Sequence, residues 1–330
     1  MHHLHLSPII ILYFLKKETM TPERPLIKLY RTRKFGEKMS DTFDFVRENW
    51  RPMLKFLTYL LLPVALVQTY AMGNFMTNQM SLSSAIGQSN MDAMIPWLSS
   101  MGVTMLFYFV AMVLVDALTY TMMQLYEQRQ ERLKGITFAE LSPGIWQKCG
   151  RQLVLLVSGL VLLIVVGLIA SPSVLLGPAA MIPVAILLFL ALPLIFLVNP
   201  IYLFEKISVV KAYVKSIRLG WKTWAGVVAV FTVLYIIVTI VESVVSMPWY
   251  IMVTLKNVLA TQNSEPAFVS SFGYSAIQYL LGVISNFCGN CLMALLSIGL
   301  AYQYGHACDK VDGVTVDRDI ENFETLNVEN

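Results

Sequence analysis

Four polar residues stand out because they interrupt long apolar runs. Asp116 lies in "VLVDALTY" and Glu242 in "IVESVVS", while Asn286 and Asn290 lie one helical turn apart in "SNFCGNC". Ionisable groups within a bilayer mark ion paths, proton relays or ligand sites. We therefore consider a proton or cation relay at these residues, with interhelical hydrogen bonds as the structural alternative. Asp116 and Asn290 fall at similar depth in their spans, so a contact between them is a further hypothesis.

Other chemistry finds little support in the residues. The chain has no zinc motif, P-loop, dinucleotide fingerprint or nucleophile elbow. Cys288 and Cys291 form a CxxC, but inside an apolar segment without the strand–helix context of redox motifs. An intramembrane enzyme would need a paired acid–base or metal constellation, and none is found. We expect a protein that is not an enzyme, with no catalytic residue, cofactor or metal.

The composition is that of a membrane protein. The chain is 56% hydrophobic and 14% charged, with a mean hydropathy of +0.63, whereas a soluble domain has about 25% charged residues. Residues 152–204 contain no Asp, Glu, Lys or Arg. Because about 20 apolar residues cross a bilayer, this block alone is long enough for two spans and a turn.

The apolar blocks predict an all-α, polytopic membrane protein with six transmembrane helices in three hairpins. The expected spans are about 54–73, 97–122, 152–171, 179–202, 224–246 and 274–303. They form one membrane domain over residues 31–308, between a disordered extension (1–30) and an acidic cytoplasmic tail (309–330). Met1 and Met20 are both candidate start residues.

The basic residues predict the orientation. Every Lys and Arg except Lys256 lies in residues 1–55, 127–151, 205–222 or the tail, so every second connection is basic. Lys and Arg are enriched in cytoplasmic loops. We therefore expect both termini in the cytoplasm.

Three amphipathic segments precede the three hairpins: Phe35–Lys55, Ile136–Arg151 and Glu205–Trp224. In the third, Ser208 is a candidate N-cap. Helical spacing gives it one basic and one aromatic–aliphatic face, which is typical of helices that lie at the membrane interface. The residues expected to contact anionic lipid of the inner leaflet are Lys211, Lys215, Arg218, Lys222, Trp221 and Trp224.

Nucleic acid is an unsuitable partner for this segment, because an apolar face and a membrane span on each side leave no free basic groove. The three segments suggest a threefold repeat of interfacial helix, span and span. The alternative is that basic amphipathic connectors are common in multi-pass proteins.

One segment carries a family resemblance. "LFEKISVVKAYVKSIRLGWKTWAGVV" (Leu203–Val228) resembles a signature segment of bacterial six-helix membrane proteins related to the membrane domain of some glycerophosphodiester phosphodiesterases. The matching positions are Glu205, Ser208, Ala212, Ser216, Gly220, Trp221 and Trp224. "RTRKFGEKMSDTFDFVRENW" (Arg31–Trp50) also resembles the N-terminal segment of standalone relatives from Bacteroidetes. Only 22 residues follow residue 308, so the resemblance implies the membrane module without a phosphodiesterase domain, in a bacterial inner membrane.

The sequence thus favours a non-enzymatic integral membrane module in lipid contact or partner assembly. Its expected partners are anionic lipids of the inner leaflet and either another protein or a second copy of the chain. The alternative is a small transporter or permease that uses Asp116, Asn286, Asn290 and Glu242. The two hypotheses differ in whether these residues face one cavity.

Overall fold

The computed structural model describes residues 25–87, 92–175, 178–261 and 268–316, and every regular element in these ranges is an α-helix. The helices are α2 (Phe35–Gly87), α3 (Met94–Gln128), α4 (Phe138–Leu175), α5 (Pro178–Phe204), α6 (Val209–Lys222), α7 (Trp224–Thr261) and α8 (Phe272–Asp312). All except α6 are long and apolar enough to cross a membrane. The prediction of an all-helical protein with six candidate spans is confirmed. The expected extension up to residue 24 and the tail from residue 317 lie outside the described residues.

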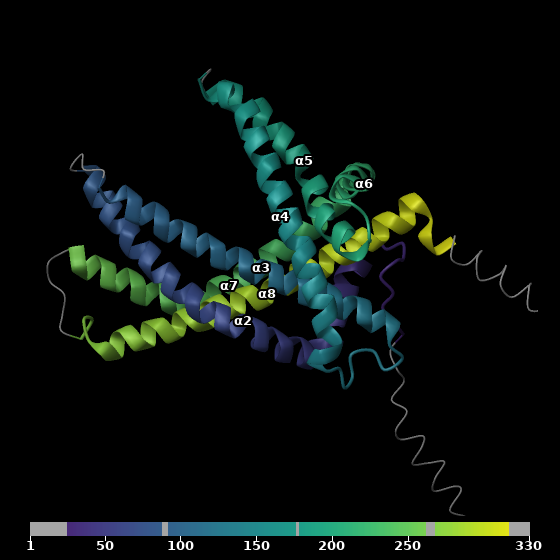
Figure 1. Cartoon of the computed structure of the whole chain (residues 1–330), viewed down its shortest axis with the longest axis horizontal. Coiled ribbons are helices and arrows are strands. Elements are labelled where there is room, and N and C mark those ends of the chain that lie inside the picture. Colours follow the sequence, from purple (N-terminus) through teal and green to yellow (C-terminus); the bar gives the residue numbers. More distant parts are fainter. Residues whose placement is uncertain (1–24, 88–91, 176–177, 262–267, 317–330) are drawn as a thin grey trace, which may run out of the picture.

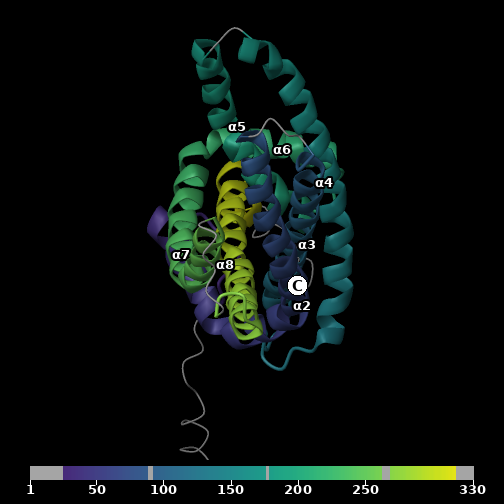
Figure 2. The ribbon, with the colours of Figure 1, turned by 90° about the vertical axis from the view of Figure 1, so that its left-hand side faces the viewer.

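Helix α8 is the central element of the bundle. It packs against α2, α3, α5, α6 and α7, and Figure 2 shows it between α7 on one side and α2 and α3 on the other. Its first turn is capped by Ser271, whose Oγ accepts a hydrogen bond from the backbone N–H of Tyr274 at 3.2 Å. Its last turn ends at Gly313, which has the left-handed φ of 67° common at helix C-caps.

Helices α4 and α5 diverge from the other four long helices and run in a different direction (Figure 1). Their side chains are exposed around much of the circumference, including Leu163 and Ile169, which are 69% and 75% exposed. An exposed apolar surface on this scale is unfavourable in water. Exposed apolar side chains are favourable in lipid. The backbone groups must then be hydrogen-bonded within the protein, and a helix satisfies this requirement.

The three amphipathic segments fold in two different ways. Phe35–Lys55 and Ile136–Arg151 continue without a break into the apolar parts of α2 and α4, and neither Pro52 nor Pro143 ends its helix. Only the third segment forms a separate helix, α6. It ends at Lys222, and at the C-cap residue Thr223 the backbone leaves helical geometry (φ −124°, ψ 23°).

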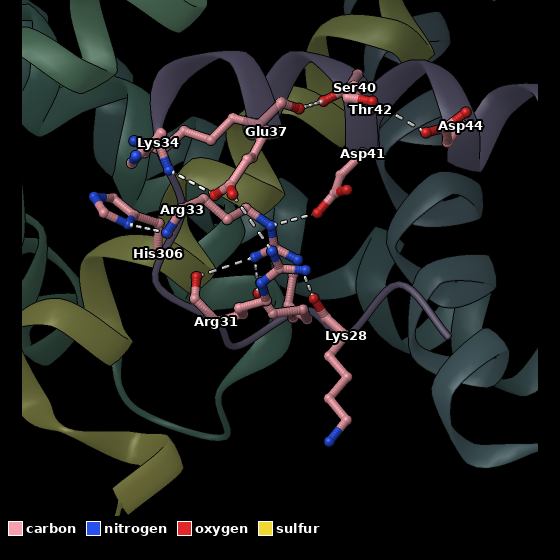
Figure 3. Close-up of polar contacts among 12 residues, drawn as sticks. Lys28, Arg31, Arg33, Lys34, Glu37, Ser40, Asp41, Thr42, Asp44 and His306 are labelled. Carbon is pink, nitrogen blue, oxygen red and sulfur yellow. Dashed lines mark hydrogen bonds and ion pairs between the residues drawn. The ribbon is translucent and has the colours of Figure 1, made fainter. Parts of the chain in front are cut away.

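Residues 25–34 are held against the end of α8, although residues 25–30 were assigned to the extension. Leu29 is buried, and so is Arg33. The Arg33 backbone N–H donates to His306 Nδ1 at 3.0 Å, and its guanidinium donates to Asp41 at 2.6 Å and to the Leu29 carbonyl at 2.8 Å (Figure 3). We call the part of the bundle formed by residues 25–34, the loop 129–137, α6 and the end of α8 the basic end.

Gly305 allows this close approach, because a Cβ there would overlap the backbone carbonyl of Leu29. We predict that Gly305→Ala lowers the free energy of unfolding by about 1–3 kcal/mol, since backbone cannot move aside as a flexible side chain can. Thermal unfolding of the full chain in detergent measures the change. Gly102→Ala is the matched control, because open space surrounds Gly102 within its helix, and Ala there should stabilise by up to about 1 kcal/mol. Equal melting temperatures for both variants would contradict the contact.

Candidate functional site

Three of the four polar candidates line one cavity. Its volume is about 270 Å³, and α3, α7 and α8 form most of its wall. The polar and aromatic residues of the lining include Tyr108, Glu242, Trp249, Tyr250, Asn286 and Asn290. Tyr108 and Tyr250 are 45% and 49% exposed, so the cavity is open at the lateral surface of the bundle. Asp116 does not line it, although its neighbour Val115 does.

Glu242 brings a carboxylate to this cavity. Among the described residues, no hydrogen bond or ion pair satisfies either of its oxygens. Gly289 faces it across the α7–α8 contact, where an added Cβ would lie 3.0 Å from Glu242 Oε1. The absence of a side chain at Gly289 therefore leaves room for the carboxylate. Glu242 is 18 residues along α7 from Trp224, about 27 Å at 1.5 Å per residue, which places the cavity far from the basic end.

The two asparagines are held by neighbours on α2 and α3. Asn286 Nδ2 donates to Thr69 Oγ1 at 3.0 Å, and its Oδ1 accepts from Tyr108 Oη at 3.2 Å. Asn290 Nδ2 donates to Gln68 Oε1 at 2.9 Å. The Gln68 Nε2 group is buried without a hydrogen-bond partner in the described part of the chain. These bonds orient the amides, and they join α8 to α2 and α3 at the level of the cavity.

Asp116 has a different role from the other three candidates. It is buried, and its carboxylate accepts from Ser297 Oγ at 2.5 Å, from Asn199 Nδ2 at 2.7 Å and from Gln152 Nε2 at 3.1 Å. The expected contact with Asn290 is wrong, because the Asn290 amide turns to α2. The contacts of Asp116 agree with the alternative of interhelical hydrogen bonds: one carboxylate on α3 is bound by donors from α4, α5 and α8. We call this arrangement the four-helix junction.

The residues that hydrogen-bond to Asp116 were not identified from the sequence. Gln152 and Asn199 lie near span ends, where polar residues are ordinary. The spacing of Ser297 does indicate a polar position, because Ser297 follows Asn290 by seven residues and therefore shares its helix face. Small hydroxyl residues are common in membrane helices, so the spacing alone could not single it out.

Glu205 organises the polar contacts at the basic end. Its Oε1 accepts from Lys215 Nζ and from Tyr304 Oη, both at 2.6 Å. Asp312 lies 3.7 Å from Lys215 and 2.8 Å from Arg218. Burial alone would lower the pKa of Lys215, but the hydrogen bond and the nearby carboxylates raise this pKa above its ordinary value. Lys215 and Arg218, both expected to contact lipid, are thus paired with carboxylates of the protein, and the Arg218 side chain is still 55% exposed.

Helix α6 has three distinct faces, since successive residues turn by about 100°. The buried face comprises Ala212, Ser216, Leu219 and Gly220. An exposed apolar face comprises Val210, Val214, Ile217 and Trp221, which are 52% to 72% exposed. The basic face comprises Lys211, Lys215, Arg218 and Lys222.

Ser208 lies at the N-cap of α6 as predicted, without a side-chain capping bond. Trp224, a predicted lipid contact, is half-buried against α5, where its indole donates to the Leu190 carbonyl at 3.2 Å.

Arg151 is the last residue of the second amphipathic segment, and the sequence analysis gave it no role. Its guanidinium donates to the backbone carbonyls of Tyr202, Glu205 and Ile207 at 2.6–3.0 Å, and it lies 4.0 Å from the centre of the Tyr202 ring. It therefore satisfies the carbonyls left open where α5 ends, before α6 begins.

Comparison with known proteins found no family model, curated protein or solved structure that matches the chain.

We predict that Asp116→Asn destabilises the protein by about 1–3 kcal/mol, because the amide replaces one acceptor oxygen by a donor that faces the donors of Gln152 and Asn199. The melting temperature of the full chain in detergent measures the loss. Asp44→Asn is the control, since Asp44 accepts only an exposed bond from Ser40. A melting temperature of the Asp116 variant equal to that of the control would argue against the four-helix junction.

Proposed function

We propose that this chain is a non-enzymatic, multi-pass protein of the bacterial inner membrane that acts through contact with anionic lipid at its cytoplasmic, basic end. The observation that carries the proposal is the geometry of α6. Its buried face docks it on the bundle, while an apolar face with Trp221 and a basic face with Lys211 and Lys222 remain exposed. A helix with these faces suits the boundary between headgroups and acyl chains.

A second feature of the basic end supports lipid contact. A cavity of about 590 Å³ lies between the first part of α2 and the loop 129–137, and its lining includes Trp50, Arg51, Lys55 and Lys134. The Arg51 guanidinium lies 5.4 Å from the centre of the Trp50 ring. Basic side chains beside an interfacial tryptophan are typical of sites that hold anionic headgroups.

The proposal includes a relation to the membrane domain of some glycerophosphodiester phosphodiesterases, which rests on Leu203–Val228. The structural roles of that segment agree with a docked helix: Glu205 accepts from Lys215, Ser208 is at the N-cap, and Ala212, Ser216 and Gly220 are buried. Assembly with a partner protein or a second copy is the remaining part of the proposal.

We predict that Lys211→Gln combined with Lys222→Gln reduces the stabilisation that anionic lipid provides. Each basic residue near an anionic surface is worth about 1 kcal/mol. The test compares melting temperatures in nanodiscs of phosphatidylcholine with and without phosphatidylglycerol. The wild-type chain should gain stability with phosphatidylglycerol, and the double variant should gain less.

Lys215→Gln is the matched control on the same helix. Because it removes the ion pairs with Glu205 and Asp312, it should lower the melting temperature in both lipid mixtures to the same extent. If the double variant keeps the full gain of the wild-type chain, lipid contact through the basic face of α6 is refuted.

The cavity favours a second candidate function, a small permease. It gathers Glu242, Asn286 and Asn290, as the transporter hypothesis requires, and leaves out Asp116. A permease would expose the cavity to water from both sides in turn.

For the permease we expect Ser246→Cys, in a chain with Cys288 and Cys291 replaced by Ser, to react with a membrane-impermeant cationic thiosulfonate added on either side of sealed vesicles. Ser246 is buried and lines the cavity, whereas Ser243→Cys is a control on the exposed surface of the same helix. Reaction from one side only, or from neither, would rule against alternating access.

A further inference from the structure

The cavity between α3, α7 and α8 has a charge that the described residues leave unbalanced. Its lining contains the Glu242 carboxylate and no Lys, Arg or His. Lys256 is 14 residues further along α7, about 21 Å at 1.5 Å per residue. A carboxylate in apolar surroundings is strongly favoured by an opposite charge, so a positively charged ligand suits this site.

The aromatic residues of the lining specify the kind of cation. Tyr108, Trp249 and Tyr250 border the same cavity as the carboxylate. The Trp249 and Tyr250 rings meet edge to face, with centroids 4.9 Å apart and an interplanar angle of 65°, so they present π surfaces in two directions. Aromatic faces attract organic ammonium groups, and the attraction strengthens where water is excluded.

The rest of the lining disfavours a hydrated metal ion. Ca²⁺ and Mg²⁺ need six or more oxygen ligands, whereas this cavity offers one carboxylate and amides that are held by neighbouring side chains. Met72, Met112 and Met293 add flexible apolar surface. Drug-sized ligands occupy pockets of about 300–1,000 Å³, so a volume of about 270 Å³ fits a small ligand.

We propose that this cavity is a binding site for a small lipophilic organic cation, which enters from the bilayer past Tyr108 and Tyr250. The Glu242 carboxylate balances the positive charge, the aromatic rings surround the ammonium group, and the methionines contact its apolar part. This inference goes beyond the proposed lipid contact at the basic end, because Glu242 lies midway along α7, about 27 Å from Trp224, where α7 follows α6. It holds for a resident ligand as well as for a transported one.

The test uses benzyltrimethylammonium and its neutral carbon analogue neopentylbenzene, which has the same shape without the charge. Isothermal titration is performed with the full chain in phosphatidylcholine nanodiscs, and the heat of empty nanodiscs is subtracted. We expect the cation to bind about three- to thirtyfold more tightly than the neutral analogue, as cation–π attraction predicts. Equal affinity for both compounds, or no heat from the cation above empty nanodiscs, overturns the proposal.

Two variants locate the site. Glu242→Gln keeps the shape of the side chain and should reduce the preference for the cation, while Tyr250→Leu should weaken binding of the cation more than binding of the neutral analogue. Glu131→Gln is the control for net charge, because Glu131 is exposed in the loop at the basic end. A preference that is as large in the Glu242 variant as in the wild-type chain overturns the proposal. If that variant does not fold, the comparison of the two compounds on the wild-type chain still decides.

Discussion

A single buried carboxylate constrains how the helices of this protein can be arranged. Asp116 on α3 is bound by Gln152, Asn199 and Ser297, which come from α4, α5 and α8. A charged or polar group without partners is costly in an apolar interior, so the three donors must reach the same point. This requirement limits the rotation of each helix about its axis. It also joins α4 and α5, which diverge from the other long helices (Figure 1), to the bundle.

The position of α6 depends on this junction through α5. Arg151 on α4 binds the carbonyls at the end of α5 and the start of the next connection, so the direction in which the chain leaves α5 is restrained by α4. Glu205 then binds Lys215 and Tyr304, which attaches α6 to α8. Small residues on the buried face allow α6 to approach closely, and its apolar stripe is left pointing outward. Exposure of Val214 and Trp221 is therefore a consequence of contacts made elsewhere.

The helices could be predicted from the sequence, but the side-chain contacts between them could not. Apolar length identifies a span because lipid leaves the backbone few alternatives, and this is why all six spans agree with α2, α3, α4, α5, α7 and α8. Depth along a span follows from counting residues, but the direction of a side chain depends on packing. Asp116 and Asn290 were placed at the same depth and were expected to meet, yet Asn290 binds Gln68 on α2. Likewise, charge pattern alone could not separate Lys215, which binds Glu205, from Lys211, which remains exposed.

Helix α8 shows why Glu242 differs from the other polar residues of the bundle. Asn286, Asn290 and Ser297 follow one face of α8, and each finds a partner on a neighbouring helix. Towards the basic end the same helix meets more polar groups, because residues 25–34, α2 and α6 all contribute them. Midway along α8, the α7–α8 contact is made at Gly289 with little side-chain volume, and Glu242 faces this glycine from α7. Among the described residues Glu242 has no hydrogen-bond or ion-pair partner, and its carboxylate borders an open cavity. This is the condition for a site that takes its counter-charge from a ligand.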